Sequence, residues 1–160
     1  MVTLVIGYGS PIRGDDAVGP LLADLVAGAI EQGNWPAGTE VQARHILTAE
    51  LVADLHRAER VIFIDAAAGG APGEVRTRRL EPDPGAPSTM AHFHDPRELL
   101  AWCEGLYGTV PEAWLVTIAG AAWDYGHFDL SPAVQAALHP ALSELRALCT
   151  SEAVIANASD

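Results

Sequence analysis

The most informative segment of the chain is Val61-Ile62-Phe63-Ile64-Asp65, a continuous apolar run that ends on a carboxylate. Continuous apolar runs of this kind are typical of parallel strands that are buried on both faces. We therefore predict a central strand over residues 61–64. Asp65 then stands at the carboxyl end of that strand, where open α/β sheets bind their ligands. The structural alternative is that Asp65 caps a turn or bonds to the Gly69-Gly70 loop.

The amino-terminal segment predicts the opening of an α/β unit. Residues 2–6 form an apolar run, and residues 7–16 are rich in the Gly, Pro and Asp that favour a turn. Over residues 18–26 the apolar side chains recur at helical spacing. A helix therefore follows the loop and begins between Asp16 and Pro20.

Strands and helices alternate along most of the remaining chain, which predicts a mostly parallel sheet. The link after Asp65 is too short for a helical crossover, so the strand over residues 73–80 should return antiparallel as the hairpin partner of the 61–64 strand. A long connection over residues 81–95 then leads to a helix that starts at Pro96. The other expected elements are a strand over 40–46, a short helix over 48–57, a strand over 114–118 and a helix over 132–148.

Together these elements predict an α/β fold, a three-layer αβα sandwich around a mostly parallel twisted sheet of about five strands, one of them antiparallel. The 160 residues, 49% of them hydrophobic, suit a single domain over residues 1–160. A domain of this size needs no metal or disulfide to fold, so a metal-binding cluster would indicate function.

The charge balance excludes several classes of function. Acidic residues number 21 against 9 basic ones, and every basic residue is an arginine. Nucleic-acid binding is disfavoured, because phosphates attract clustered positive charge. The absence of lysine excludes Schiff-base chemistry and a Walker-type phosphate loop. Cys103 and Cys149 lie far apart in the sequence, which fits free thiols in a reducing cytoplasm. The first apolar run stops at Gly7 and is too short to span a membrane. We expect a cytoplasmic protein.

The pair Asp15-Asp16 follows the first loop directly. Helix capping is the commoner role for such a pair, but two adjacent carboxylates leave one free to face the ligand crevice. If both strands are parallel, this pair and Asp65 lie on the same edge of the sheet. The Gly7-Tyr8-Gly9 turn is an incomplete dinucleotide motif, because Ile12 occupies the position of its third glycine.

Two of the six histidines, His92 and His94, lie in the long connection before Pro96. That connection must return to the carboxyl edge of the sheet, so either histidine could meet the two aspartates there. Two carboxylates and an imidazole form a site for a borderline divalent ion with open positions. Three protein ligands are few for tight binding, which suggests an ion delivered or completed by a partner. No HExxH, cysteine cluster or Gly-x-Ser-x-Gly motif is present.

These motifs resemble those of the hydrogenase maturation endopeptidases. The resemblance rests on the loop over residues 6–19, on Val61-Ile62-Phe63-Ile64-Asp65-Ala66, and on His92 followed by Pro96 and Leu99-Leu100. It continues through Pro111-Glu112-Ala113-Trp114, Tyr125-Gly126 and Leu130-Ser131-Pro132, and so covers nearly the whole chain in order. Ser10 departs from the family, which usually has asparagine there.

The resemblance implies an endopeptidase that removes the C-terminal extension from the nickel-loaded large-subunit precursor of a nickel-iron hydrogenase. It implies that Asp16, Asp65 and His92 are the catalytic and metal-binding residues. The spacing from His92 to Pro96 matches the family and favours His92 over His94. The nickel is supplied by the precursor, although other divalent ions can substitute in crystals. We expect a monomer that has no membrane or nucleic-acid partner.

Two other functions fit the same residues. One is a small-ligand or nucleotide-binding α/β module, in which residues 7–14 hold an anion without catalysis. The other is a metallo-adaptor, which holds the hydrogenase precursor at the same site without cutting it.

Overall fold

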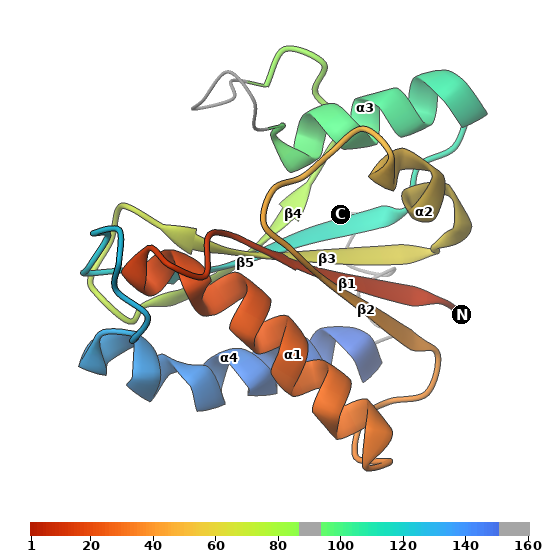
Figure 1. Ribbon diagram of the computed structural model, residues 1–160. Helices are drawn as coiled ribbons and strands as arrows, with labels where there is room; N and C mark the ends of the chain where they lie inside the picture. Colours follow the sequence, from red (N-terminus) through yellow and green to blue (C-terminus); the bar gives the residue numbers. More distant parts are fainter. Residues whose placement is uncertain (87–93, 151–160) are drawn as a thin grey trace.

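The computed structural model describes residues 1–86 and 94–150 (Figure 1). In chain order, the elements are β1 (Thr3–Tyr8), the short 3-10 helix η1 (Gly14–Ala17), α1 (Val18–Glu31), β2 (Thr39–Arg44), α2 (Leu51–Arg57), β3 (Arg60–Ala67), β4 (Val75–Leu80), α3 (Pro96–Tyr107), β5 (Glu112–Ala119) and α4 (Pro132–Thr150). Among the described residues, no helix combines the length and the apolar character needed to cross a bilayer.

The described strands form one five-stranded sheet in the order β2-β1-β3-β5-β4. The strands β1, β2, β3 and β5 run parallel, whereas β4 runs antiparallel to β5. Figure 1 shows α1 and α4 on one face of the sheet and α2 and α3 on the other. The predicted α/β fold, with three layers and a single antiparallel strand, is therefore confirmed.

The predicted neighbour of β4 is wrong. The strand does reverse direction, as the short link after β3 requires, but it pairs with β5 and not with β3. Instead β5 lies between them and pairs in parallel with every residue of β3. The reason is physical: β5 is mostly apolar and buried, which suits the interior of a sheet, whereas β4 carries Arg76, Arg78 and Arg79, which suit an edge.

The central position of β3 explains its continuous apolar sequence. Val61 and Phe63 pack in the cluster formed with α2 and α3, whereas Ile62 and Ile64 pack in the cluster formed with α1 and α4. All four side chains are fully excluded from solvent. The strand predicted over residues 61–64 is thus confirmed, and Asp65 continues the same strand into the open end of the sheet.

The strand β1 and the helix α1 cross at two glycines. A Cβ atom on Gly7 would lie 2.0 Å from the carbonyl oxygen of Gly19, and one on Gly19 would lie 2.5 Å from that of Tyr8. No side chain fits between backbones at these distances, so both positions require glycine. The crossing fixes the loop over residues 9–17, which carries both aspartates of the first motif, against the carboxyl end of the sheet.

Candidate active site

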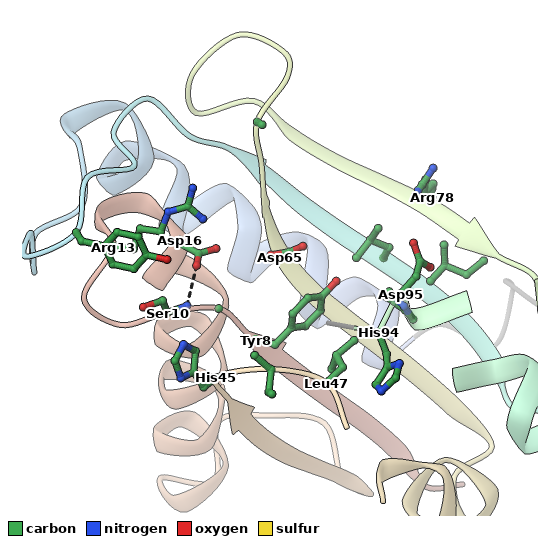
Figure 2. A pocket seen from close by; sticks show the side chains of 17 residues that line it. Tyr8, Ser10, Arg13, Asp16, His45, Leu47, Asp65, Arg78, His94 and Asp95 are labelled. Atoms are coloured by element: carbon green, nitrogen blue, oxygen red, sulfur yellow. Dashed lines mark hydrogen bonds between the residues drawn. The ribbon is translucent and has the colours of Figure 1, made fainter. Parts of the chain in front are cut away.

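A pocket of about 500 Å³ opens at the carboxyl ends of β1 and β3 (Figure 2). It lies on the face of the sheet that carries α2 and α3, beyond the apolar residues that these helices cover. Its lining comes from seven parts of the chain, including the first loop, the segment after β2 and the start of α3. The polar and charged side chains of the lining are Tyr8, Ser10, Arg13, Asp16, His45, Asp65, Arg78, His94, Asp95 and Tyr125.

Asp16 faces the pocket from η1. One of its carboxylate oxygens, Oδ2, accepts a hydrogen bond of 2.8 Å from the backbone amide of Ser10. The chain can approach this closely because Gly9 has a φ of +145°, and a Cβ there would lie 2.1 Å from the Asp16 carbonyl oxygen. The sequence resemblance implies asparagine at this position, where the chain has Ser10, but the contact uses the backbone of that residue and not its side chain.

Asp65 faces the same pocket from the end of β3. Its Oδ1 accepts a hydrogen bond of 2.8 Å from the Ala66 amide. The phenol of Tyr8 lies beside the carboxylate and favours its charged form (Figure 2). Burial, followed by the negative charge of Asp16, raises the pKa of Asp65 to about 7. The Tyr8 phenol and the Ala66 amide lower the pKa of Asp65 but do not cancel the rise.

The structure thus places Asp16 and Asp65 on one pocket, close enough for the charge of one to shift the pKa of the other. Within the described residues, neither carboxylate forms an ion pair. Two partly buried carboxylates without a basic partner repel each other, and a cation that bound between them would relieve this repulsion.

His92, the third predicted ligand, lies outside the described residues. Within residues 1–86 and 94–150, no three His, Cys, Asp or Glu side chains gather closely enough to hold a metal ion. The described part of the chain therefore supplies two of the three predicted ligands. His94 lines the pocket, where its Nδ1 lies 2.8 Å from Oε1 of Glu98 and its ring packs edge-on against Trp102.

Asp15, the neighbour of Asp16, is fully buried and does not cap α1. Its carboxylate accepts four hydrogen bonds of 2.7–2.9 Å, from the amides of Ala121, Ala122 and Ser131 and from the Ser131 hydroxyl. Burial alone would raise the pKa of Asp15, but these hydrogen bonds outweigh it and lower the pKa below its ordinary value. Asp15 thus ties the first loop to the segment after β5.

Sequence reasoning missed several residues of the pocket wall. The sequence pattern places Tyr8 in a glycine turn, yet its phenol lies beside Asp65 (Figure 2), and burial together with the charge of Asp65 raises the pKa of Tyr8. His45 falls inside the strand predicted over residues 40–46, yet it lines the pocket just after β2. Asp95 also lines the pocket and caps α3 by accepting a hydrogen bond from the Arg97 amide. A position just beyond a strand end, or just before a helix, is the signal that could have pointed to them.

Comparison with known families decides the class of this protein. The sequence profile of the HycI family, described as hydrogenase maturation protease, matches residues 46–147, which is more than half of the chain. The chain belongs to the hydrogenase maturation protease family. It is therefore a maturation endopeptidase, a hydrolase of peptide bonds, as the sequence resemblance predicted. The matched region contains Asp65 and His92, whereas Asp16 lies before it.

Solved structures of maturation proteases share the fold of this one. The hydrogenase maturating endopeptidase HybD from E. coli is 25% identical, with a TM-score of 0.77 over 92% of this chain and 91% of its own. The [NiFe] hydrogenase maturation protease HycI from Thermococcus kodakarensis KOD1 is 17% identical, with a TM-score of 0.71 over 94% and 93%. HybD from Thermococcus kodakarensis is 23% identical, with a TM-score of 0.67 over 94% and 100%. No protein with a curated description matches this maturation protease significantly.

Proposed function

We propose that this maturation protease removes the C-terminal extension from the nickel-loaded large-subunit precursor of a nickel-iron hydrogenase, with Asp16, Asp65 and His92 meeting the nickel of the precursor. The observation that carries the proposal is the pair of carboxylates, Asp16 and Asp65, on one open pocket without a basic partner among the described residues. Such a pair attracts a cation that a substrate brings with it.

The chemistry of the donors suits nickel as part of the substrate. Carboxylate oxygen and imidazole nitrogen are ligands that borderline divalent ions accept, and His92 would add the nitrogen to the two oxygens. Three protein donors leave coordination positions open, as expected if the hydrogenase precursor already holds most of the ion's ligands. A free protein of this kind needs no resident metal, because the substrate delivers the ion.

Residues of the chain prepare this site before the substrate arrives. The Ser10 amide orients Asp16, while the Ala66 amide orients Asp65 and the Tyr8 phenol favours its charged form. When bound, the nickel supplies positive charge that polarises a carbonyl or lowers the pKa of a water molecule. The other possible mechanism uses the ion only to position the scissile bond, while a carboxylate accepts a proton from the attacking water.

The proposal predicts that each of Asp16→Asn, Asp65→Asn and His92→Ala leaves the fold intact and lowers the rate of trimming by about 100-fold or more, the size expected when an acid–base or charge-stabilising group is lost. Mass spectrometry of the nickel-loaded precursor, before and after incubation, measures the cut directly. Matched controls are Asp24→Asn and His139→Ala, which remove the same groups from exposed positions of α1 and α4 and should trim at the wild-type rate.

The same experiment separates this function from its alternatives. A wild-type protein that forms a stable complex with the precursor but leaves its mass unchanged would be a metallo-adaptor and would contradict the proposal. A protein that binds a nucleotide in calorimetry without metal, and ignores the precursor, would be a ligand-binding module. Wild-type trimming in all three site variants would reject the assignment of Asp16, Asp65 and His92.

A further inference from the structure

Three exposed apolar side chains gather beside the mouth of the pocket. Ile12 is 44% exposed, Tyr125 is 68% exposed and Phe128 is 74% exposed. Ile12 belongs to the loop over residues 9–17, and the other two belong to the segment over residues 120–131 that follows β5. Tyr125 also lines the pocket itself. We call these three residues the rim; nothing within the described chain covers them.

The rim is held in place by hydrogen bonds between its two loops. The Gly126 amide donates to the Ile12 carbonyl over 2.8 Å, and the Gly14 amide donates to the His127 carbonyl over 2.9 Å. At the base of the rim, the Asp15 carboxylate accepts its four hydrogen bonds from residues 121, 122 and 131. A surface that is already ordered loses little conformational entropy on binding, and exposed aromatic groups on such a surface are typical of protein interfaces.

Arg13 supports the rim from its inner side. Its Nε donates a hydrogen bond of 3.1 Å to the Trp123 carbonyl, and its guanidinium lies 5.5 Å from the ring centroid of Tyr125 and 5.8 Å from that of Trp123. These contacts hold the Arg13 guanidinium against the rings of Tyr125 and Trp123. The partly buried arginine therefore holds Tyr125 in place.

The exposed charged side chains next to the rim are acidic. Asp124 and Asp129 are both exposed and flank the two aromatic residues in the segment Asp124-Tyr125-Gly126-His127-Phe128-Asp129. Neither aspartate forms an ion pair within the described residues. A complementary surface would carry an apolar centre with basic side chains around it.

From these observations we infer that the rim is the docking surface for the folded body of the hydrogenase precursor, and that the precursor presents there an apolar patch bordered by basic residues. The inference rests on the proposed function. Tyr125 belongs both to the rim and to the pocket wall, so a substrate that enters the pocket also lies against the rim. The precursor's body then lies against the rim while the segment to be cut reaches Asp16 and Asp65.

The test measures equilibrium binding of the nickel-loaded precursor to the whole protein by surface plasmon resonance. The double variant Ile12→Ser/Phe128→Ser should bind at least about tenfold more weakly than wild type, since interface aromatics often dominate binding. The matched control is Leu106→Ser/Tyr107→Ser, which removes two side chains with 73% and 43% exposure from the end of α3, away from the pocket. This control should bind as wild type does.

The charge component has its own measurement. The variant Asp124→Asn/Asp129→Asn should associate more slowly with the precursor, and its binding should depend less on salt concentration. Circular dichroism and thermal unfolding check that every variant is folded.

The outcomes distinguish failure of the docking surface from failure of the proposed function. Equal affinity of the rim variant and wild type, or an equal loss in the α3 control, would overturn the docking surface while leaving the trimming function standing. A wild-type protein that binds through the rim but never trims would contradict the proposed function alone. A wild-type protein that does not bind the precursor would contradict both.

Discussion

Asp15 and Asp16 are adjacent in the chain and have different environments. The carboxylate of Asp15 is saturated by four hydrogen bonds from one distant segment, whereas Asp16 accepts one from Ser10 and otherwise faces the pocket. A saturated buried carboxylate has no capacity left for a ligand. The pair therefore divides its roles: Asp15 stabilises the loops, and Asp16 remains available to the substrate.

Asp15→Asn should destabilise the protein by about 3 kcal/mol, because an amide NH₂ would face the backbone N–H groups that now donate to a carboxylate. Unfolding in urea, with the midpoint and slope compared with wild type, measures the loss. The control is Asp24→Asn on the exposed face of α1, where the change should stay within about 0.5 kcal/mol. A loss of similar size in both variants would show that the hydrogen bonds of Asp15 contribute little.

The raised pKa of Asp65 predicts that the stability of the substrate-free protein depends on pH. This pKa is about 7 in the folded state against an ordinary value of 3.8, so the folded state holds this proton more tightly than the unfolded chain does. The contribution of Asp65 to stability is therefore greatest at acid pH and falls as the pH rises from about 4 to 7. Asp65→Asn cannot lose a proton, so its stability relative to wild type should increase across that window.

Urea unfolding of wild type and Asp65→Asn at several pH values within this window tests the prediction. Asp54→Asn is the contrasting variant, because hydrogen bonds from Arg57 and Gln42 lower the pKa of Asp54 and its carboxylate supports folding when charged. A stability difference between wild type and Asp65→Asn that stays constant with pH would contradict a raised pKa at Asp65.

The position of Asp65 could be predicted from sequence because it depends on local pattern alone: an apolar run ends and a carboxylate follows. The roles within the Asp15-Asp16 pair could not, because the partners of Asp15 lie 106 to 116 residues further along the chain. No local pattern indicates which of two adjacent carboxylates a distant loop will contact. The third site residue, His92, stays a prediction, since it lies outside the described residues.

At the scale of elements, the contact between β1 and α1 holds the first loop in place. Gly7 and Gly19 bring the two backbones together where any larger residue would collide with a carbonyl oxygen. The glycines of the first motif therefore serve packing, which agrees with the incomplete dinucleotide pattern noted at Ile12. Their effect on the active site is indirect: they set the position from which Asp16 enters the pocket.

Gly19→Ala should destabilise the protein by about 2 kcal/mol or more, since overpacking against backbone atoms cannot be relieved by a side-chain movement. Gly28→Ala is a matched control in the same helix, because a Cβ there meets no atom within 4 Å. That control should gain about 0.5–1 kcal/mol from the higher helix propensity of alanine. Thermal or urea unfolding measures both, and equal effects in the two variants would contradict the tight crossing.

The strand β4 shows which properties of an element can be predicted from the local sequence and which cannot. Its reversal follows from the short link after β3, which is a local property of the chain. The identity of the strand that pairs with β4 does not follow from the link. It depends on whether β4 or β5 is the more apolar strand and takes the interior position beside β3. Comparing the three arginines of β4 with the apolar residues of β5 would have favoured β4 at the edge. The overall layers were predictable because they require only the order of helices and strands.

On the scale of the whole molecule, the end of the sheet opposite the pocket is closed by a buried ion pair. The side chain of Arg60 is fully buried; its Nε lies 2.8 Å from Glu112 Oε2, and its Nη1 donates to the Leu148 carbonyl over 2.7 Å. These contacts join β3, β5 and α4. The positive charge also lies near the carboxyl end of a helix, where the helix dipole favours it.

Arg60→Ala should destabilise the protein by about 3–5 kcal/mol, because it removes both hydrogen bonds and leaves Glu112 without its closest cation. Trimming by the folded fraction should stay near the wild-type rate, since the substitution lies at the far end of the sheet from the pocket. Thermal unfolding together with the precursor assay at low temperature measures both effects. A variant that is as stable as wild type, or one that is stable but inactive, would contradict this separation of the two ends.

The bonding of Asp15 to the segment after β5 has a consequence for engineering new specificity. The carboxylate of Asp15 joins the loop that carries Asp16 to the loop that carries Tyr125 and Phe128. Exchanging either loop alone would therefore leave buried hydrogen-bond donors without a partner. Chimeras between relatives that recognise different hydrogenases should therefore retain activity only when both loops are transplanted together.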